Sequence, residues 1–168
     1  MADTAVTAER PATVAAGLRV RRAVEADRLG LFKLAVAMHR ETSFRAYEFN
    51  PEKAVNNLGA WIHGGFMAVA EKDGQVVGML AATKRSPWFS DDPLVSEDLF
   101  YVAEAHRGTR AGYMLMREFM AWARENAPCH VRAGVATGTG PAAERLYEHF
   151  GMAYQGGNFA LDLPGEQA

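Results

Sequence analysis

The alternation of apolar and polar residues predicts one strand and two helices in the first part of the chain. Residues 18–21 alternate as Leu-Arg-Val-Arg, which is typical of a strand. Acidic residues at 25 and 27 then stand where a helix would begin. The apolar stripe of that helix consists of Leu31, Leu34, Ala35 and Met38. A second helix is predicted from Pro51 to about Ile62, and Gly64 and Gly65 end it.

Two apolar runs in the middle of the chain predict a β-hairpin. Residues 66–71 and 75–82 are separated by Lys72-Asp73-Gly74, and an Asp-Gly pair between two such runs is a strong hairpin signal. Residues 86–93 contain two prolines and two aromatic residues, which indicates a loop. A fourth strand is predicted at 97–103.

Helices and strands alternate in the last part of the chain. We predict a long helix at 109–126, a fifth strand at 129–136, a short helix at 141–150 and a final strand at 158–163. A further short strand is expected near 152–154. This order predicts an α/β fold, in which about four helices flank a mixed sheet of six to seven strands.

The length and composition indicate one domain. The chain has 168 residues, which fits a single hydrophobic core. Residues 1–17 are rich in Ala, Thr and Val and are predicted to form a flexible tail, so the domain spans 18–168. With 49% hydrophobic and 23% charged residues, the chain is neither collagen-like nor disordered. The longest apolar runs, such as 66–70, are far below the roughly 18 residues of a membrane helix, so no membrane span is expected.

Charge, cysteine and histidine content exclude several other classes. Eighteen basic and 20 acidic residues give a net charge of −2, without the basic excess that nucleic-acid binding requires. The single cysteine, Cys129, cannot form an internal disulfide, which favours a reducing compartment and makes the cytoplasm the expected location. The five histidines show no metal-ligand spacing, so no metal is expected.

The sequence Arg107-Gly108-Thr109-Arg110-Ala111-Gly112 lies between the fourth strand and the long helix, and it has the chemistry of an anion site. Glycines let backbone N–H groups face outward together, and the start of a helix carries a partial positive charge that attracts phosphate. Arg107 and Arg110 would add two cations. The turn is neither a Walker A loop nor a G-x-G-x-x-G turn. The alternative is that the glycines only shape the turn and the arginines are solvated.

At this turn the chain resembles the GNAT superfamily of N-acetyltransferases, whose turn reads Arg/Gln-x-x-Gly-x-Gly/Ala after the fourth strand. Here it runs from Arg107 to Gly112, and Val102 supplies the aliphatic residue that precedes it. Arg110 replaces the family's middle glycine, where its side chain would either crowd a pyrophosphate or add a favourable charge.

Three other segments are similar to the family, and the resemblance covers about residues 18–163. They are Arg21 to Asp27, Gln75 to Leu80, and Ala143 to Met152 with its Leu-Tyr pair. Gly140 stands where an asparagine often precedes the tyrosine by seven residues.

The resemblance implies a mostly antiparallel sheet and transfer of an acetyl group from acetyl-CoA to a primary amine in a ternary complex. It implies that Tyr147 is the general acid for the departing thiolate, and that backbone amides near 101–103 bind the thioester oxygen. The residues expected to bind acetyl-CoA are Tyr101, Val102, Ala103, Arg107, Gly108, Thr109, Arg110, Ala111 and Gly112. For Tyr147 the alternative is simple packing beneath the helix.

Amine attack also needs a base, because an aliphatic ammonium with a pKa near ~10 must lose a proton first. Glu97 and Asp98 are the nearest carboxylates to the predicted site. Successive strand residues point to opposite faces, so one of the two would face the cleft, and we favour Glu97. A solvated carboxylate at the strand entrance is the alternative.

The acceptor amine is either a small molecule or a protein amino group. Residues 39–47 and 87–92 are expected to flank the acceptor cleft, where Asp91 and Asp92 suit a cation and Arg40 and Arg45 suit a carboxylate. A non-catalytic acyl-CoA sensor is the alternative function. A homodimer stays open.

Overall fold

The computed structural model describes residues 17–135, 141–157 and 160. Residues 1–16 of the predicted tail and most of the predicted strand at 158–163 lie outside the described residues, and Ala160 does not lie in a strand. In the described part of the chain, no helix combines the length and apolar character that a bilayer crossing needs.

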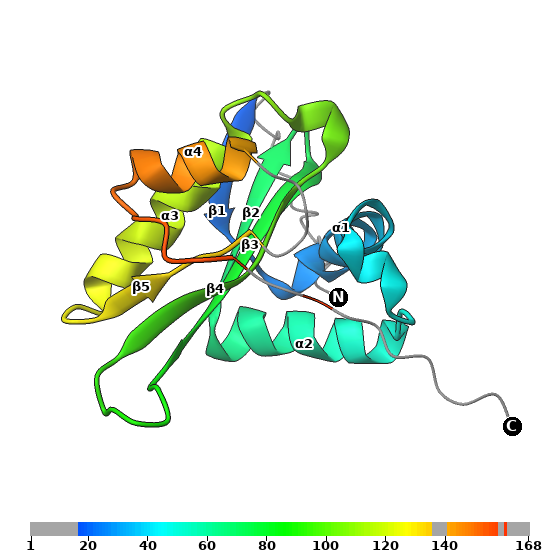
Figure 1. The fold of residues 1–168 in the computed structure, drawn as a ribbon. Helices are drawn as coiled ribbons and strands as arrows, with labels where there is room; N and C mark the ends of the chain where they lie inside the picture. The colour runs from blue at the N-terminus through cyan, green and yellow to red at the C-terminus, as the bar shows by residue number, and fades with distance from the viewer. Residues whose placement is uncertain (1–16, 136–140, 158–159, 161–168) are drawn as a thin grey trace, which may run out of the picture.

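Among the described residues, five strands form one sheet in the order β1-β2-β3-β4-β5 (Figure 1). They are β1 (Leu18–Arg22), β2 (Phe66–Lys72), β3 (Gln75–Arg85), β4 (Leu94–Val102) and β5 (His130–Arg132). The first three pairings are antiparallel, and β4 pairs with β5 in parallel. The mixed, mostly antiparallel sheet is therefore confirmed, whereas the described residues form five strands and not the predicted six to seven.

The strand expected near 152–154 fails for a physical reason. Gly151 has a φ of +82°, and its N–H donates to the carbonyl of Glu148, while the N–H of Met152 donates to the carbonyl of Tyr147 over 3.1 Å. These two bonds form a Schellman motif that ends the preceding helix. The amide of Met152 is thereby used as a helix cap and is not available to a sheet.

The β2–β3 hairpin matches its sequence signal. Asp73 and Gly74 both have positive φ, of 51° and 79°, as a two-residue type I′ turn requires. The turn sets Lys72 opposite Gln75 at the start of the ladder. This register directs alternate residues of β2 to opposite faces of the sheet, and both faces are buried.

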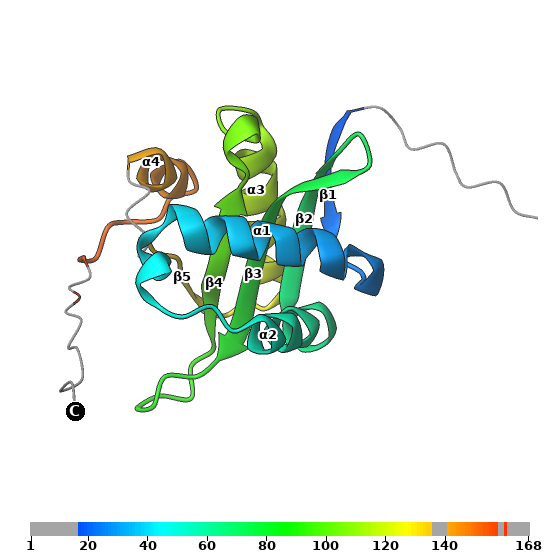
Figure 2. The same ribbon diagram turned by 90° about the vertical axis from the view of Figure 1, so that its right-hand side faces the viewer.

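Two helices cover each face of the sheet (Figures 1 and 2). The first helix, α1 (Arg28–Glu41), follows a 3-10 turn at Glu25–Asp27, and α2 (Pro51–Gly64) begins at Asn50, whose side chain accepts from the N–H of Lys53. Met67 and Val69 pack on this side with α1 and α2. The other face carries α3 (Ala111–Glu125) and α4 (Pro141–His149), which pack against Phe66 and its neighbours.

Strand β4 has two irregularities that matter for the site. Ala81 pairs with Leu99 and Ala82 with Glu97, so Asp98 is the extra residue of a β-bulge. The pairing with β5 covers only residues 94–96 of β4. Beyond Ser96, the β5 side of β4 has no strand partner in the described part of the chain.

Candidate active site

Glu97 and Tyr147, two of the predicted catalytic residues, are in direct contact. The hydroxyl of Tyr147, on α4, donates to Oε2 of Glu97, on β4, over 2.9 Å. The N–H of Gly134, in the segment after β5, lies 3.5 Å from the same carboxylate oxygen. Tyr147 is 9% exposed and packs with the core between the sheet and α3. The pair therefore bridges the region where β4 and β5 separate.

The surroundings shift the pKa of both groups upward. Burial raises the pKa of Glu97 to about 7, against the opposing effect of the hydrogen bonds from Tyr147 and Gly134. Burial first, and then the neighbouring Glu97 charge, raise the pKa of Tyr147 far above its usual value. Glu97 can thus exchange a proton near neutral pH, while Tyr147 stays protonated and acts as a hydrogen-bond donor.

The side chain of Asp98 points toward α2, on the opposite face of the sheet from α4. One of its carboxylate oxygens, Oδ2, accepts a hydrogen bond from Nε1 of Trp61, on α2, over 3.2 Å. Glu97 bonds to a helix on one face of the sheet and Asp98 to a helix on the other, but both residues line the cavity described below, so the expectation that one of the two faces the cleft is not confirmed. The bulge itself was not predicted.

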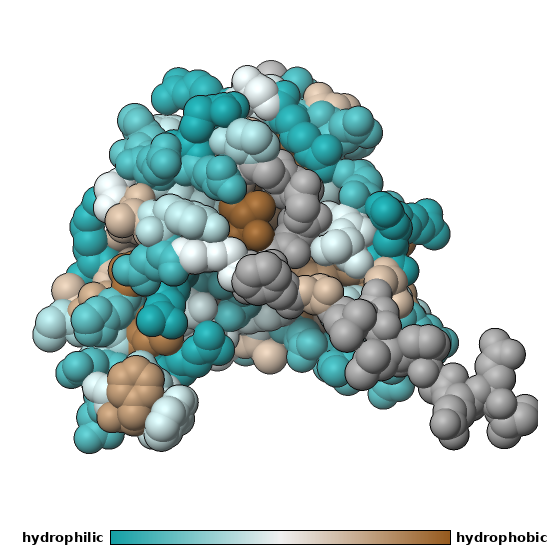
Figure 3. All heavy atoms as spheres, in the orientation of Figure 1, coloured by the Kyte–Doolittle hydropathy of each residue, from teal (hydrophilic) through white to brown (hydrophobic). Residues whose placement is uncertain are grey.

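A cavity of about 170 Å³ lies beside the Glu97–Tyr147 pair. Its walls come from the end of α1, the turn after it, β4, the segment after β5, and α4. The lining residues are Met38, Phe44, Glu97, Asp98, Leu99, Phe100, Gly134, Val135, Ala143 and Tyr147. Apolar walls with a few polar groups are typical of a site for small molecules. Figure 3 shows that the surrounding face is mostly hydrophilic, with a small apolar area near its centre.

The predicted anion turn joins β4 to α3. A 3-10 turn, Glu104–His106, comes first, and Gly108 then takes a φ of +75°. The hydroxyl of Thr109 donates to the carbonyl of His106 over 2.7 Å and accepts from the N–H of Ala111 over 3.3 Å. The following amides of α3 have no acceptor inside their own helix, so they point out of its first turn. This geometry fits a phosphate.

Of the two arginines in the turn, only Arg110 is left for an anion. Arg107 turns back, donating from Nε to the carbonyl of Val102 over 3.0 Å and pairing through Nη2 with Glu41. Arg110 is exposed at the start of α3, and no carboxylate in the described part of the chain lies within ion-pair distance of it. That both side chains serve an anion stays a prediction, and Arg110 is the one of the two without a carboxylate partner among the described residues.

Glu41, at the last position of α1, is a residue that the sequence did not single out. Its carboxylate accepts from the hydroxyl of Tyr101 over 2.8 Å and pairs with Arg107, whose guanidinium lies 5.5 Å from the centre of the Tyr101 ring. Burial and the Glu41 carboxylate raise the pKa of Tyr101 to about 12. Glu41 and Arg107 are 66 residues apart, so no local pattern could reveal the pair.

The backbone amides of residues 101–103 point in two directions. The N–H of Ala103 donates to the carbonyl of Val77 on β3 over 2.9 Å. Because antiparallel ladders alternate, Tyr101, opposite Met79, also directs its amide toward β3. Val102 directs its N–H to the other edge, where β4 has no strand partner among the residues that the structure describes. Val102 is thus the amide of the three that is placed to receive a ligand oxygen.

The two segments expected at the acceptor cleft differ in position. Phe44, from the first segment, lines the cavity, and Arg40 and Arg45 are exposed. Residues 87–92 lie in the β3–β4 loop, where Trp88 is 95% exposed, and none of them lines the cavity. Arg85, one residue before this loop, was not singled out by the sequence.

The other residues considered in the sequence are Cys129, the possible metal ligands and Gly140. Cys129 is half-buried against the core, and its thiol lies 3.3 Å from the carbonyl of Ala123. In the part of the chain that the structure describes, no three His, Cys, Asp or Glu side chains gather as a metal site would require. Gly140, in place of the family's asparagine, lies outside the described residues.

Comparisons with known proteins place the chain among acetyltransferases. Residues 31–152 match the model of the acetyltransferase (GNAT) family. No match was found among curated protein sequences.

Three solved structures illustrate the likeness in fold. An acetyltransferase from Trypanosoma brucei has 17% identity, with 88% of this chain and 100% of that chain covered and a TM-score of 0.66. The aminoglycoside 6′-N-acetyltransferase AAC(6′)-IG from Acinetobacter haemolyticus has 16% identity, covers 88% and 99%, and has a TM-score of 0.66. AAC(6′)-Iy in complex with a CoA bisubstrate analogue has 10% identity, covers 89% and 100%, and has a TM-score of 0.70.

Proposed function

Because the chain belongs to the acetyltransferase (GNAT) family, we propose that it transfers an acetyl group from acetyl-CoA to a primary amine by direct attack in a ternary complex. The hydrogen bond between Tyr147 and Glu97 is the observation that carries this proposal. The bond couples Glu97, which can accept a proton near neutral pH, to Tyr147, which can donate one. Both side chains line the 170 Å³ cavity between β4 and α4.

The residues present fit acetyl-CoA at two points. The outward amides of the first turn of α3, with Gly108 and the exposed Arg110, would hold the diphosphate. The N–H of Val102 would hold the thioester oxygen, which gains negative charge during attack; such a donor contributes about 3–4 kcal/mol in other acyl transfers. Arg107, through its bond to the Val102 carbonyl, would fix this end of β4 rather than bind phosphate.

Glu97 and Tyr147 would carry the protons of the reaction. Glu97 accepts the first proton of the acceptor ammonium and passes it to solvent. When acetyl-CoA is bound, it supplies the thioester whose C–S bond breaks as the C–N bond forms. Glu97 then accepts the second nitrogen proton, and Tyr147 gives its hydroxyl proton to the departing sulfur. The proton on Glu97 finally restores Tyr147 across their 2.9 Å hydrogen bond.

The proposal extends to the domain boundaries, the cellular location, the acceptor and the oligomeric state. Residues 18–168 would act as one catalytic domain. The protein would work in the cytoplasm, where Cys129 stays a free thiol. The acceptor would be an amine, and a homodimer stays a prediction.

Release of free thiol from acetyl-CoA tests the proposal. The purified protein is incubated with acetyl-CoA and a panel of amines, and we expect thiol release with at least one of them. Binding of coenzyme A without release on any amine, together with no effect of Tyr147→Phe, would favour the acyl-CoA sensor instead. The absence of a thermal shift with coenzyme A would contradict both functions.

A further inference from the structure

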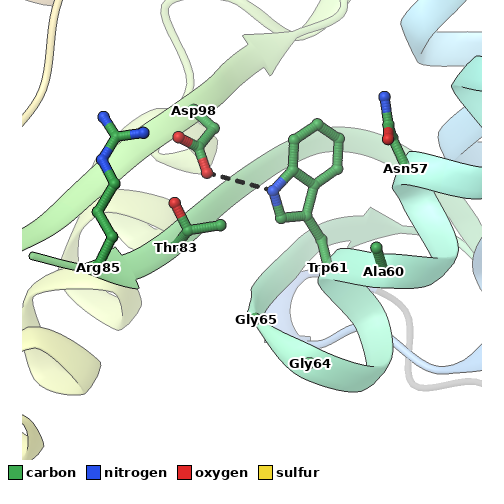
Figure 4. A pocket seen from close by; sticks show the side chains of 8 residues that line it. All are labelled: Asn57, Ala60, Trp61, Gly64, Gly65, Thr83, Arg85 and Asp98. Atoms are coloured by element: carbon green, nitrogen blue, oxygen red, sulfur yellow. Dashed lines mark hydrogen bonds between the residues drawn. The ribbon is translucent and has the colours of Figure 1, made fainter.

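A second and larger cavity, of about 430 Å³, lies between α2 and the ends of β3 and β4 (Figure 4). It is lined by Asn57, Ala60, Trp61, Gly64, Gly65, Thr83, Arg85 and Asp98. This volume is within the usual range for small-molecule sites, about 300–1,000 Å³. The functional site described above uses Asp98 alone among these residues.

Asp98 connects the two cavities. It lines the larger one with Trp61 and the smaller one with Glu97 and Tyr147. The bulge makes this position special, because the extra residue lets Glu97 bond to α4 while its neighbour bonds to α2. A ligand in the larger cavity with one end at Asp98 therefore lies next to the proton-carrying pair.

The Asp98 end of the cavity suits a cation. Oδ2 accepts from the indole of Trp61, and in the described part of the chain no arginine, lysine or histidine nitrogen lies within ion-pair distance of this carboxylate. The indole hydrogen bond holds the carboxylate beside a half-buried aromatic ring. A carboxylate without a cationic partner attracts an ammonium group.

The Arg85 end suits an anion. Its Nη2 lies 3.4 Å from the hydroxyl of Ser96, which is a long contact, and no carboxylate of the described residues pairs with its guanidinium. Thr83 precedes it by two residues on the same face of β3, and Figure 4 shows the Arg85, Thr83 and Asp98 side chains on one wall, facing Trp61 and Asn57 on the other. A guanidinium with free donors binds a carboxylate in bidentate fashion.

We propose that this cavity binds the acceptor, and that the acceptor is a small amine that also carries a carboxylate, as amino acids do. This proposal rests on the proposed acetyl transfer. Opposite charges face one cavity without pairing with each other, so a ligand with both charges satisfies each of them. The ammonium binds at Asp98, next to Glu97, and the carboxylate binds at Arg85. A polycationic amine would bring positive charge against Arg85, which disfavours it.

Matched acceptor pairs test the chemical class. Thiol release from acetyl-CoA is measured with phenylalanine against phenethylamine and with lysine against cadaverine. Each pair differs only in the carboxylate, so we expect a KM for the amino acid that is roughly ten- to a hundredfold lower. Equal KM values within each pair, or a lower KM for the plain amine, would overturn the proposal.

Substitutions at Arg85 test the assignment of the residue. Arg85→Ala removes the guanidinium and should raise the KM for the amino acids by a similar factor, while the KM for acetyl-CoA and the kcat stay close to their original values. Arg85→Glu should reverse the preference within each pair. Lys84→Ala, at the exposed neighbouring position on β3, is the matched control and should change neither KM. An effect of Lys84→Ala equal to that of Arg85→Ala would contradict a specific carboxylate site.

The two proposals fail in different ways. Thiol release with plain amines but not with amino acids would disprove the aminocarboxylate acceptor and leave acetyl transfer intact. Binding is read separately, from the thermal shift that phenylalanine causes in the original protein and in Arg85→Ala. A shift that is the same in both would also overturn the assignment to Arg85.

Discussion

Tyr147 and Glu97 lie fifty residues apart in the sequence, yet the hydroxyl of one donates to the carboxylate of the other over 2.9 Å. The bond ties α4 to β4 where β5 has separated from β4. The bond also links the protonation of the two side chains. Burial and the negative charge of Glu97 raise the pKa of Tyr147, and the Tyr147 hydroxyl partly offsets the cost of ionising a buried carboxylate.

Tyr147→Phe should lower kcat by roughly a hundredfold, since general acid catalysis contributes about 10²–10⁴. The phenyl ring keeps the packing of the buried tyrosine, so the KM for acetyl-CoA should change little. Thiol release under saturating conditions measures the effect. Tyr154→Phe, at a tyrosine that is 75% exposed, is the control. A kcat within twofold of the original would rule out Tyr147 as the acid.

The pH dependence of kcat/KM should show a rising limb with an apparent pKa of about 7, the value expected for Glu97. Glu97 must be ionised to accept a proton, so activity is lost as the pH falls below that value. Glu97→Gln should lower the rate and remove this limb. A limb that persists in the variant belongs to another group.

Glu97→Gln should also stabilise the protein at neutral pH. The folded state raises the pKa of Glu97 from 4.5 to about 7, so it binds more protons than the unfolded state between these values, and the free energy of unfolding falls as the pH rises through this window. Glutamine does not titrate. The variant should therefore gain up to about 3 kcal/mol relative to the original at pH 8 but little at pH 4.5.

Urea unfolding at the two pH values measures this gain. Glu48→Gln, at an exposed glutamate, is the control and should show no such difference between the two pH values. If the variant is less stable than the original at pH 8, ionised Glu97 raises the free energy of unfolding instead of lowering it.

Local signals in the sequence predicted most of the fold. The Asp73-Gly74 turn, the proline at the start of α2 and the glycine after α4 all depend on neighbouring residues only, so the elements they bound were found. The strand near 152–154 was wrong because Met152 caps a helix, and its residue types alone do not distinguish a cap from a strand. The divergence of β4 and β5 depends on packing between distant elements and leaves no local pattern.

The candidate site was predicted in part for the same reason. The Leu-Tyr motif named Tyr147, and the position of Glu97 near the predicted site named the carboxylate, but neither revealed the hydrogen bond that joins them. Glu41 and Arg85 were missed, because a carboxylate at a helix end and an arginine at a strand end are common on surfaces. Their significance comes from partners that are distant in the sequence: Glu41 holds Arg107, and Arg85 lies in the same cavity as Asp98.

Glu41→Gln should lower kcat by several-fold and leave the KM for the acceptor unchanged. Glu41 positions Arg107 and Tyr101, and Arg107 in turn holds the carbonyl of Val102, whose amide faces the open edge of β4. Tyr101→Phe should have a similar effect, and the double variant should be less than additive because the two residues share one network. Fully additive losses would show that they act separately. Glu52→Gln, in the exposed first turn of α2, is the control.

Gly108→Ala should weaken coenzyme A binding by roughly five- to tenfold, because the alanine turn leaves the left-handed conformation in the ligand-free protein and must regain it, at about 1 kcal/mol, when the ligand binds. Gly108 has a φ of +75°, and no atom lies within 4 Å of an added Cβ, so backbone strain is the only cost. Gly108→Asn should bind more tightly than Gly108→Ala, since asparagine tolerates this conformation. Calorimetric titration with coenzyme A measures both. Equal binding by the alanine variant would show that the turn does not hold the ligand.

In the described part of the chain, the separation of β5 from β4 after Ser96 leaves a strand edge of β4 exposed when no ligand is bound. The N–H of Val102 and the backbone groups of Phe100 on that side can pair with an extended peptide, which is how unprotected strand edges lead to aggregation. The ligand-free protein would therefore be the form most prone to aggregate during concentration or storage. Bound coenzyme A would cover this edge and would therefore also protect the protein against aggregation.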